Sequence, residues 1–528
     1  MPRSRVSQTH RSKRKPAKPN YFGRRVAIVG VLAALLYGIG WGVWRIGHAV
    51  NNRLQTPAVA ALPFQPDVDV LVVGGTPAGV AAAIAAARHG ASVALVSEHP
   101  KLGGDIVYAY LNMFDVPLTG PHTDTSPTAY GIFGQMFKVL GTAFDISDAE
   151  KLLDQMVARE PQIRRINDAR VTRVLLRASR LEGVEIRNSD GTAERITATA
   201  IVDATNDANI AARAGASYTL GREKINPDRK LQAAGLLFSV KGVKWAGVKS
   251  YVKSTVTVPL AQAMRFKKGI KKAIDVKIEG NKALIRQGGI HGDYAWERGD
   301  IVKDYVPRGP DIDVISINFG RQSDGSVILN TLNVVNVNGL EVASKAHAHA
   351  EASAEIPLLI AYLRKKMPGF KNATLGGIAP ELYIRETRHI SGFATLDVGD
   401  IRGGTPFYDR VALASYALDL HPYVKGDLNP YGPTRYLYCL PLRALVPRKV
   451  DGIFVASRSL SATYSAAGSA RVIPITMAAG EAVGTAAALC SKRGFSPHDL
   501  AKSPAKISAL QKELRAEGMD IGDQLVKR

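Results

Sequence analysis

The segment IRETRHISG, residues 384–392, gathers four side chains suited to binding anions or exchanging protons within five positions. They are Arg385, Glu386, Arg388 and His389. A guanidinium holds an oxyanion at fixed geometry, and an imidazole exchanges a proton near neutral pH. The segment predicts an anion clamp with a proton donor beside it, although any one of these residues fits an ion-paired turn at a domain interface equally well. On a strand, Arg388 and His389 would face opposite ways, so only one of them would serve the same site.

A second candidate lies in SYALDLH, residues 415–421, where Asp419 and His421 share a face if the chain is extended. A carboxylate two residues from an imidazole sets the imidazole's tautomer, or simply forms a structural hydrogen bond with it. We expect Arg388 to be the clamp and His389 or His421 to be the acid or base. The catalytic candidates are Arg385, Arg388, His389 and His421.

The stretch DVLVVGGTPAGVAAA, residues 69–83, is nearly the G-x-G-x-x-G turn of a dinucleotide-binding βαβ unit. Gly74 and Gly79 fill the first and third glycine positions, but Thr76 stands at the second. Threonine is a good helix N-cap, and Pro77 suits the first helical position. The loop therefore predicts a helix that starts facing an anion.

The elements around this loop are those that the turn requires. An apolar run precedes it, and AGVAAAIAAARHG predicts a small-residue helix that stops at Gly90. The next apolar run, ASVALV, ends beside Glu98, which lies 24 residues after Gly74. A carboxylate at this spacing meets the ribose hydroxyls of an adenosine. The alternative is an ordinary βα turn with an acid there by chance.

Distant segments predict an α/β fold in which one cofactor domain is interrupted by another. KLGGD, residues 101–105, places paired glycines just past Glu98. A period-two meander around SDG ends in the apolar strand AIVDAT, and VDGIFVAS, residues 450–457, is another apolar strand followed by a small-residue helix. These two strand-to-turn signals lie about 250 residues apart.

The 528-residue chain is too long for one ordinary core, and its net charge of +23 is uneven. Residues 1–65 hold 11 of the 69 Lys and Arg residues and no acid. The remainder has no long basic run or interleaved aromatic stripe, so we expect no nucleic-acid partner. Cys439 and Cys490 are too few for a four-thiolate cluster or a C-x-x-C pair, so redox chemistry requires an organic cofactor.

No metal site is expected either. In KAHAHAEA, residues 345–352, a helix would point His347 and His349 roughly 200° apart, which does not suit joint ligation.

The N-terminus predicts a membrane segment. Nine of the first 25 residues are Lys or Arg, and residues 26–44 then run without a charge, about 28 Å as a helix. The basic flank should remain in the cytoplasm, which places the rest of the chain on the extracytoplasmic side. Because Arg24 and Arg25 precede the run and AVAA follows at 58–61, a cleaved twin-arginine-type signal is the alternative to a single-pass anchor.

Several blocks together resemble the FAD-dependent oxidoreductase family related to the flavoprotein component of heterodisulfide reductases and, more distantly, to fumarate reductase flavoproteins. The resemblance covers roughly residues 66–520, and the blocks recur in order. They are VVGGTPAGVAAAIAAARHGASVALVSE, KLGG, AIVDATNDANIAARAGA, LYIRETRHISG, SYALDLHPY and VDGIFVASRSLSATYSAAGSARVIPITMAAGEAVGTAAAL.

The resemblance implies FAD as the cofactor, and it implies roles for individual residues of the site. The loop of residues 74–79 would cradle the pyrophosphate, Glu98 would hold the adenosine ribose, and the helix around Gly480 would approach the flavin. The implied cofactor-binding residues are Gly74, Gly75, Thr76, Pro77, Ala78, Gly79, Glu98, Gly103, Gly104, Asp203, Ala204, Thr205, Ser469, Ala470, Arg471 and Gly480.

Two departures from the family accompany the resemblance. Asn206 replaces a glycine in the usual A-T-G-D turn, where asparagine tolerates left-handed geometry better than most residues. The thiolates that iron–sulfur clusters need are missing.

The sequence thus predicts a Rossmann-like FAD-binding domain interrupted by an α+β substrate-facing domain, with an N-terminal transmembrane helix. Its expected function is hydride transfer between FAD and an unidentified small organic substrate, with an unknown electron acceptor. A non-catalytic flavin-binding assembly module is the alternative. The expected parts are a basic tail (1–25), the membrane helix (26–44), a linker (45–65), the first FAD-binding part (66–235), the insert (236–409) and the second FAD-binding part (410–528).

Overall fold

The computed structural model describes most of the chain beyond residue 64. The described residues are 65–115, 131–226, 228–259, 276–279, 282–297, 299–432 and 434–526. Residues 66–528 form one compact unit. The predicted basic tail, the membrane helix and the linker up to residue 64 lie outside the described residues, so their structure stays a prediction.

A seven-stranded sheet carries the glycine-rich loop. Its strands are β1 (Val68–Val73), β2 (Val93–Val96), β3 (Ile163–Ile166), β4 (Arg170–Arg177), β5 (Arg180–Arg187), β6 (Ala193–Asp203) and β20 (Ile453–Val455). β1 pairs in parallel with β2 and β6, and β2 pairs in parallel with β3. β4 and β5 form the antiparallel edge next to the first half of β6.

β20 enters this sheet from the far end of the sequence. It pairs in parallel with β6, and Val455 lies opposite Asp203. Because carboxyl ends of parallel strands meet at one edge of a sheet, the loops after β1, β6 and β20 come together. This pairing places residues near 75, 205 and 457 at one site.

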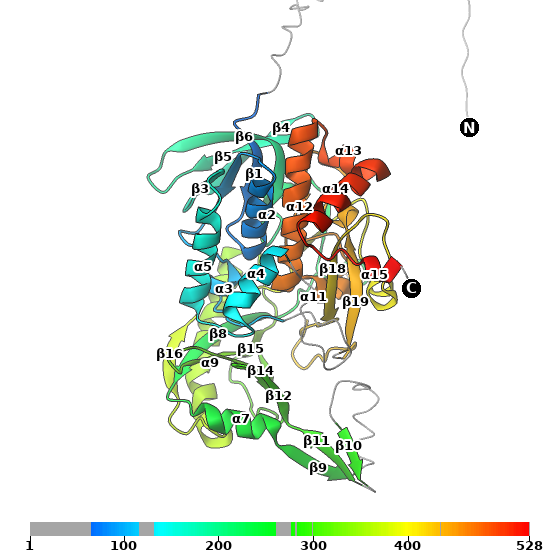
Figure 1. Ribbon diagram of the computed structural model, residues 1–528. Coiled ribbons are helices and arrows are strands. Elements are labelled where there is room, and N and C mark those ends of the chain that lie inside the picture. Colours follow the sequence, from blue (N-terminus) through cyan, green and yellow to red (C-terminus); the bar gives the residue numbers. More distant parts are fainter. Residues whose placement is uncertain are drawn as a thin grey trace, which may run out of the picture. The chain divides into compact units, whose positions relative to one another are not determined.

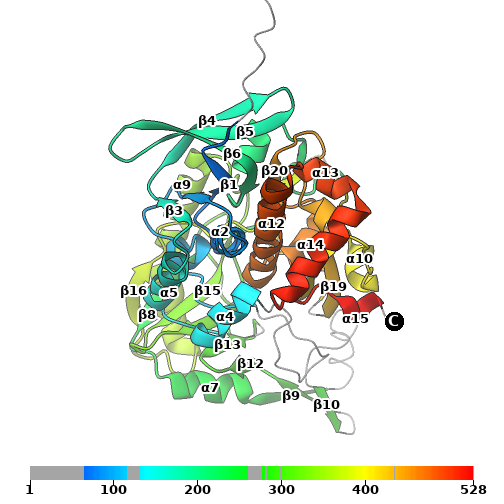
Figure 2. The same cartoon turned by 45° about the horizontal axis from the view of Figure 1, so that its top comes forward.

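Helices α2 (Pro77–Arg88) and α12 (Ile473–Arg493) lie side by side against the sheet (Figures 1 and 2). Glycines allow this close approach. A Cβ added at Gly480 would stand 2.2 Å from the carbonyl oxygen of Ala78, and one at Gly484 would stand 2.2 Å from that of Ala82. Among the described helices, α12 alone is long and apolar enough to cross a membrane, but 94% of its apolar window is buried, so it is a core helix.

Shorter elements complete this part of the molecule. The helices are α3 (Asp105–Tyr108), α4 (Gly131–Leu140), α5 (Ile146–Ala158), α6 (Asn209–Arg213), α10 (Val398–Gly403), α11 (Tyr464–Ala470), α13 (Pro497–Lys502), α14 (Pro504–Ala516), α15 (Asp523–Val526) and the 3-10 turn η1 (Leu442–Ala444). Two small antiparallel pairs are β7 (Tyr218–Leu220) with β17 (Arg388–Ile390) and β18 (Arg410–Ala417) with β19 (Arg435–Pro441).

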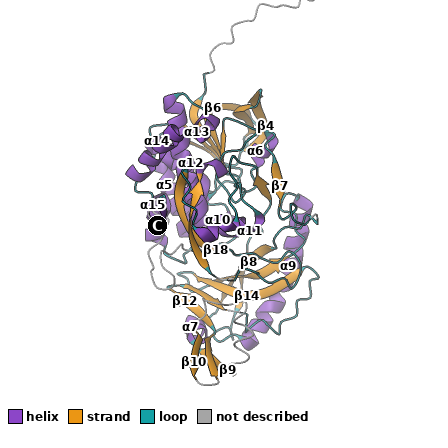
Figure 3. Cartoon of the chain, turned by 90° about the vertical axis from the view of Figure 1, so that its right-hand side faces the viewer, coloured by secondary structure: helices purple, strands orange, loops and turns teal. Residues whose placement is uncertain are grey.

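A second, six-stranded antiparallel sheet is built from the middle of the chain and has its own apolar core (Figure 3). It contains, in spatial order, β12 (Gly288–His291), β13 (Tyr294–Glu297), β14 (Ile312–Arg321), β15 (Val327–Val334), β8 (Ala234–Lys241) and β16 (Thr374–Ile378). Helices α7 (Trp245–Lys253) and α9 (Val342–Lys366) pack against it. A small sheet of β9 (Thr255–Pro259), β10 (Val276–Glu279) and β11 (Lys282–Arg286) follows α7.

Because β8 begins at Ala234, the boundary expected between residues 235 and 236 falls inside a strand of the second sheet. The domain limits as a whole stay a prediction. His349, on α9, approaches the carbonyl oxygen of Ala379 at 2.8 Å through Nε2. Within the described ranges, no group of three potential metal ligands is present.

Candidate functional site

The turn from β1 into α2 is shaped by its glycines and capped by Thr76. The Thr76 hydroxyl accepts a hydrogen bond of 3.1 Å from the Gly79 amide and donates one of 3.0 Å to the carbonyl oxygen of Ala204. Gly74 has φ +124°, and a Cβ at Gly79 would stand 1.9 Å from the Gly74 oxygen. Threonine at the second glycine position therefore ties the turn to the end of β6.

A second glycine turn lies against the first. The Gly103 amide donates to the Gly75 carbonyl oxygen at 2.8 Å, and Gly104 adopts φ +48°. A Cβ at Gly104 would stand 3.3 Å from the Cα atom of Thr76. The two expected glycine segments thus form one surface, and Asp105 follows directly at the start of α3.

The chain after β6 takes an unexpected course. Asp203 is buried and accepts hydrogen bonds from the amides of Ile210 and Ala211 at 2.9 and 2.8 Å, and from the Thr205 amide at 3.0 Å. Its carboxylate therefore caps α6. The left-handed residue of this turn is Ala208, with φ +50°, rather than Asn206. Asn206 instead donates to Asp105 Oδ1 at 3.2 Å.

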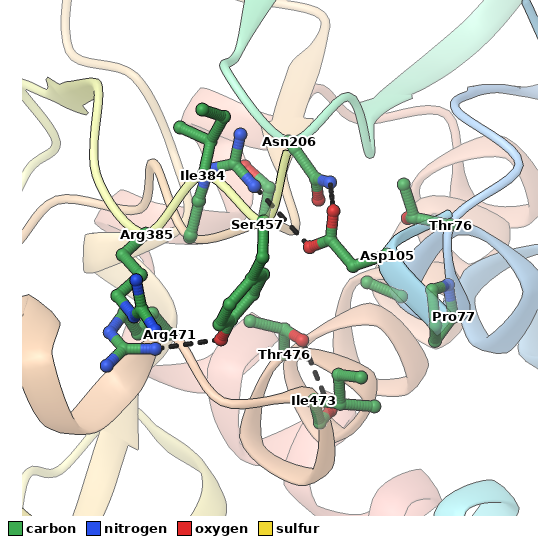
Figure 4. A pocket seen from close by; sticks show the side chains of 13 residues that line it. Thr76, Pro77, Asp105, Asn206, Ile384, Arg385, Ser457, Arg471, Ile473 and Thr476 are labelled. Atoms are coloured by element: carbon green, nitrogen blue, oxygen red, sulfur yellow. Dashed lines mark hydrogen bonds and ion pairs between the residues drawn. The ribbon is translucent and has the colours of Figure 1, made fainter. Parts of the chain in front are cut away.

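A pocket of about 430 Å³, partly open to solvent, lies where these loops meet. Figure 4 shows Thr76, Pro77 and Asp105 on one side of it and Arg385 and Arg471 on the other. We call it the first pocket. Its lining is Thr76, Pro77, Ala78, Asp105, Asn206, Tyr383, Ile384, Arg385, Ser457, Arg458, Arg471, Ile473 and Thr476.

Arg458, just after β20, organises the charges of the first pocket. Its guanidinium contacts Asp105 at 3.5 Å and Asp207 at 2.7 Å. Burial raises the pKa of Asp105 to about 6, although Arg458 opposes this shift. The Nε atoms of Arg385, Arg458 and Arg471 are buried and have no hydrogen-bond acceptor in the part of the chain that the structure describes.

A second pocket of about 360 Å³ adjoins the first. The two pockets share Tyr383, Arg385 and Arg471. The second pocket extends toward the second sheet through Asn318 on β14 and Asn330 on β15. Its lining is Leu111, Met113, Asp115, Asn318, Asn330, Tyr383, Arg385, Tyr416, Asp419, His421 and Arg471.

The two shared arginines differ in their partners. Arg471 donates to the Tyr383 hydroxyl at 2.8 Å and pairs with Asp419 at 2.9 Å. Arg385, which is 3% exposed, donates to the carbonyl oxygen of Ala233 at 2.8 Å and approaches Asn330 Oδ1 at 3.4 Å. Burial, together with the charge of Arg471, lowers the pKa of Arg385 to about 10.

Asp419 and His421 lie together in the second pocket. His421 Nε2 stands 3.4 Å from Asp419 Oδ2, and Nδ1 stands 3.0 Å from the Asn333 carboxamide oxygen. Burial, reinforced by Arg385, lowers the pKa of His421 to about 4. Burial opposes ionisation of Asp419, but His421 and Arg471 outweigh it and hold that pKa below its usual range. His421 is therefore neutral at neutral pH, and Asp419 is ionised.

Asp115 and Tyr416 form a second acid–base pair in this pocket. Burial raises the pKa of the Asp115 carboxyl, against the hydrogen bond from Tyr416. Burial also raises the pKa of Tyr416. This carboxyl can hold a proton at higher pH than an exposed aspartate can.

Two predicted catalytic residues line neither pocket. Arg388 donates to the carbonyl oxygen of Asp207 at 2.7 Å and to Asn209 Oδ1 at 2.9 Å. His389 is buried, with Nε2 3.0 Å from Glu386 Oε1. Of the four candidates, Arg385 and His421 meet at the second pocket, whereas Arg388 and His389 connect neighbouring segments.

The predicted cofactor residues are also spread over different roles. Thr76, Pro77, Ala78 and Arg471 line the first pocket. Glu98 is exposed and pairs with Arg170 at 2.9 Å.

Ser469, in α11 with Ala470, is buried and hydrogen-bonded to Tyr438 at 2.9 Å and to the Tyr416 carbonyl oxygen at 3.2 Å. Gly480 provides the close contact between α12 and α2. These residues line neither pocket and instead contribute to the packing of the elements around the site.

Sequence reasoning missed several lining residues. Asp105 belongs to the KLGGD segment and Asn206 to the turn after AIVDAT. Ser457 and Arg458 lie at the end of a predicted strand, which is where parallel sheets place ligands. The position of Ser457 and Arg458 could therefore have identified them as lining residues from the sequence. Asp115, Asn318 and Asn330 had none, because they enter the second pocket from segments without a motif.

The comparisons with known proteins show the family of the chain. A family model described as FAD dependent oxidoreductase matches residues 69–514. No curated protein matches the chain.

Solved structures match over most of the chain at low identity. A geranylgeranyl bacteriochlorophyll reductase-like protein from Thermoplasma acidophilum is 12% identical, covering 87% of this chain and 90% of its own, with a TM-score of 0.41. A flavin-dependent brominase is 10% identical, covering 85% and 83%, with a TM-score of 0.42. The p-nitrophenol 4-monooxygenase of Pseudomonas putida is 9% identical, covering 87% and 91%, with a TM-score of 0.39.

Proposed function

Since this chain belongs to the FAD-dependent oxidoreductase family, we propose that it transfers hydride between FAD and a small polar organic substrate held in the second pocket. The observation that carries the proposal is the sharing of Tyr383, Arg385 and Arg471 by the two pockets. A substrate in the second pocket would lie directly beside a cofactor in the first.

The first pocket suits a dinucleotide. The glycine turn at Gly74 and Gly79 leaves no space for side chains, so backbone amides at the start of α2 are open to a pyrophosphate. The buried Nε atom of Arg458 has no hydrogen-bond acceptor among the described residues. An oxygen-rich ligand would supply one. We infer that Thr76, Pro77, Ala78 and Arg458 hold the cofactor, which supplies a hydride acceptor or donor when bound.

The side chains of the second pocket would orient the substrate and exchange a proton with it. Arg385 and Arg471 orient the substrate, because each is fixed by partners outside the bound molecule. His421, neutral at neutral pH, is available to take a proton from a substrate hydroxyl or amine. Asp115, whose pKa is raised, is the alternative acceptor.

Anaerobic reduction tests this function. The purified full-length chain should bind FAD, without covalent attachment, rather than NAD. Its flavin absorbance should bleach with one class among hydroxy acids, sugars, amines and thiols. A chain that binds FAD but is reduced by none of these donors would contradict the proposal and favour a binding module.

We further propose that residues 26–44 anchor the chain in a membrane, or act as a cleaved export signal, with the FAD-binding unit on the extracytoplasmic side. The basic flank and the charge-free run of residues 26–44 support this placement. A reporter fused after Arg528 should be active only outside the cytoplasm. Activity confined to the cytoplasm would refute it.

The closer relationship to the flavoprotein component of heterodisulfide reductases and to fumarate reductase flavoproteins belongs to the proposal as well. The ordered blocks of sequence support it. Because both cysteines are buried and free, cluster-dependent electron transfer is not carried over with the relationship.

A further inference from the structure

Arg385 is a buried cation that no carboxylate of the described residues contacts directly, although Asp419 and Asp115 act on its charge from a distance. Within the described ranges, no Asp or Glu oxygen forms an ion pair with it, and its Nε atom has no acceptor. Its two hydrogen-bond acceptors are the carbonyl oxygen of Ala233 and the side chain of Asn330, which are both neutral, and the guanidinium lies 5.0 Å from the centre of the Tyr383 ring. A guanidinium that is 3% exposed and has no carboxylate in direct contact is costly to bury, so the site favours an anion supplied from outside the chain.

The other two arginines of the pockets do not share this condition. Arg458 pairs with Asp105 and Asp207, and Arg471 pairs with Asp419. The charge of Arg471 also bears on Arg385 and increases its need for a negative partner. Of these three arginines, only Arg385 therefore has no ion pair among the described residues.

The remaining walls of the second pocket suit hydroxyl groups. Asn318 and Asn330 offer both donors and acceptors, and Asp115 and Tyr416 add a carboxyl and a phenol. Only Leu111 and Met113 are apolar among the lining residues. Such a surface would leave polar atoms without partners around a purely apolar molecule.

We propose that the substrate is a small hydroxylated carboxylic acid, whose carboxylate binds Arg385 and whose hydroxyl groups face the carboxamides and carboxyl groups of the second pocket. The inference rests on the proposed function and names the substrate class of that site. A carboxylate fits the planar guanidinium with two oxygens. A phosphate dianion fits less well, because Asp115 and Asp419 line the same pocket and would repel the additional charge.

Equilibrium binding tests the substrate class apart from turnover. Full-length protein loaded with FAD is titrated anaerobically with propionate, propionamide and glycerate, and the initial shift of the flavin absorption spectrum reports binding. Propionate should bind at least about tenfold more tightly than its neutral isostere propionamide, because a charge-assisted hydrogen bond is lost with the charge. Glycerate should bind several-fold more tightly than propionate, because its hydroxyl groups add hydrogen bonds.

Variants of Arg385 test the assignment. Arg385→Gln should bind propionate and propionamide about equally, and Arg385→Lys should retain part of the preference because it keeps the charge. FAD content is measured for each variant from its absorption spectrum. Arg321→Gln is the matched control, since Arg321 ends β14 and pairs with Asp293 outside both pockets. It should behave as the unaltered chain does.

Three outcomes would overturn the inference. The first is equal binding of propionamide and propionate by the unaltered protein, and the second is failure of propionate and glycerate to bind at any soluble concentration. The third is loss of FAD from Arg385→Gln with a preference for propionate that survives reconstitution, which would make the cofactor the anion of Arg385.

The substrate class and the proposed function fail separately. Flavin reduction by a neutral donor, without binding of carboxylates, would keep the proposed function and remove this substrate class. Binding of carboxylates with no reduction by any donor would keep this substrate class and remove the proposed function.

Discussion

Arg471 donates a hydrogen bond of 2.8 Å to the hydroxyl of Tyr383, and both side chains line both pockets. The contact joins the turn before α12 to the segment that leads to Arg385. Because Arg471 also pairs with Asp419, one guanidinium connects the cofactor side of the site with its acid–base side. The two sides are therefore expected to respond together to ligands.

Gly480→Ala should destabilise the protein and weaken FAD binding. The added Cβ would stand 2.2 Å from the backbone oxygen of Ala78, which cannot move without shifting the start of α2. Overpacking of this kind costs about 1–3 kcal/mol. Thermal unfolding with and without FAD measures it. Gly403→Ala is the control, because a Cβ there meets nothing within 4 Å. Equal stability of the two variants would contradict the close packing of α2 and α12.

Glu98→Ala should weaken the binding of FAD by about 1.5–3 kcal/mol, the range for a lost hydrogen bond to a charged group. The apoprotein should lose less than about 1 kcal/mol, because the pair with Arg170 is exposed. Arg170→Ala separates the two effects. It removes the same ion pair but leaves the carboxylate free for a ribose, so its FAD affinity, measured by fluorescence titration, should not fall. Equal losses of affinity in both variants would mean that the ion pair, and not the carboxylate, matters.

Glu481→Gln should make the free energy of unfolding less sensitive to pH between 6 and 8. Burial raises the pKa of Glu481 to about 8, although its hydrogen bond from the Ile132 amide opposes the shift. A carboxyl whose folded pKa lies above its unfolded value stabilises the protein fully at low pH and loses that contribution as pH rises through the folded pKa. The unaltered chain should therefore lose roughly 2 kcal/mol of unfolding free energy relative to the variant across this window. Parallel pH profiles from urea unfolding would contradict a protonated Glu481.

His421→Gln should slow substrate-driven flavin reduction by about 10² to 10⁴-fold if the imidazole is the proton acceptor. In the unaltered chain, the pKa lowered to about 4 keeps the imidazole neutral above that pH. The reduction rate should therefore stay level from pH 5 to 8 and fall only toward pH 4. Anaerobic stopped-flow measurements across this range check the profile. A fall centred near the ordinary histidine value of 6.5 would show that the site does not depress this pKa.

The local shape of the cofactor turn could be predicted from the sequence. Thr76 caps α2, Pro77 starts it and Gly74 takes a positive φ, because each of these depends on the backbone within a few residues. The paired glycines at 103 and 104 were recognised for the same reason. The FAD cofactor followed from the ordered motifs, which the family match bears out.

The membership of the second pocket was decided only by tertiary structure. Arg385, Arg388 and His389 stand within five positions, yet pairing of β17 with β7 directs Arg388 and His389 to other partners, while Arg385 reaches the pockets. The family resemblance implies that Asp203 lies near the cofactor, and only the structure shows that its carboxylate caps α6, because buried amides require an acceptor. Asn318 and Asn330 come from a separate sheet, whose approach to β18 no local pattern encodes. Residue types and short spacings fix a turn, whereas packing between distant strands fixes which side chains share a pocket.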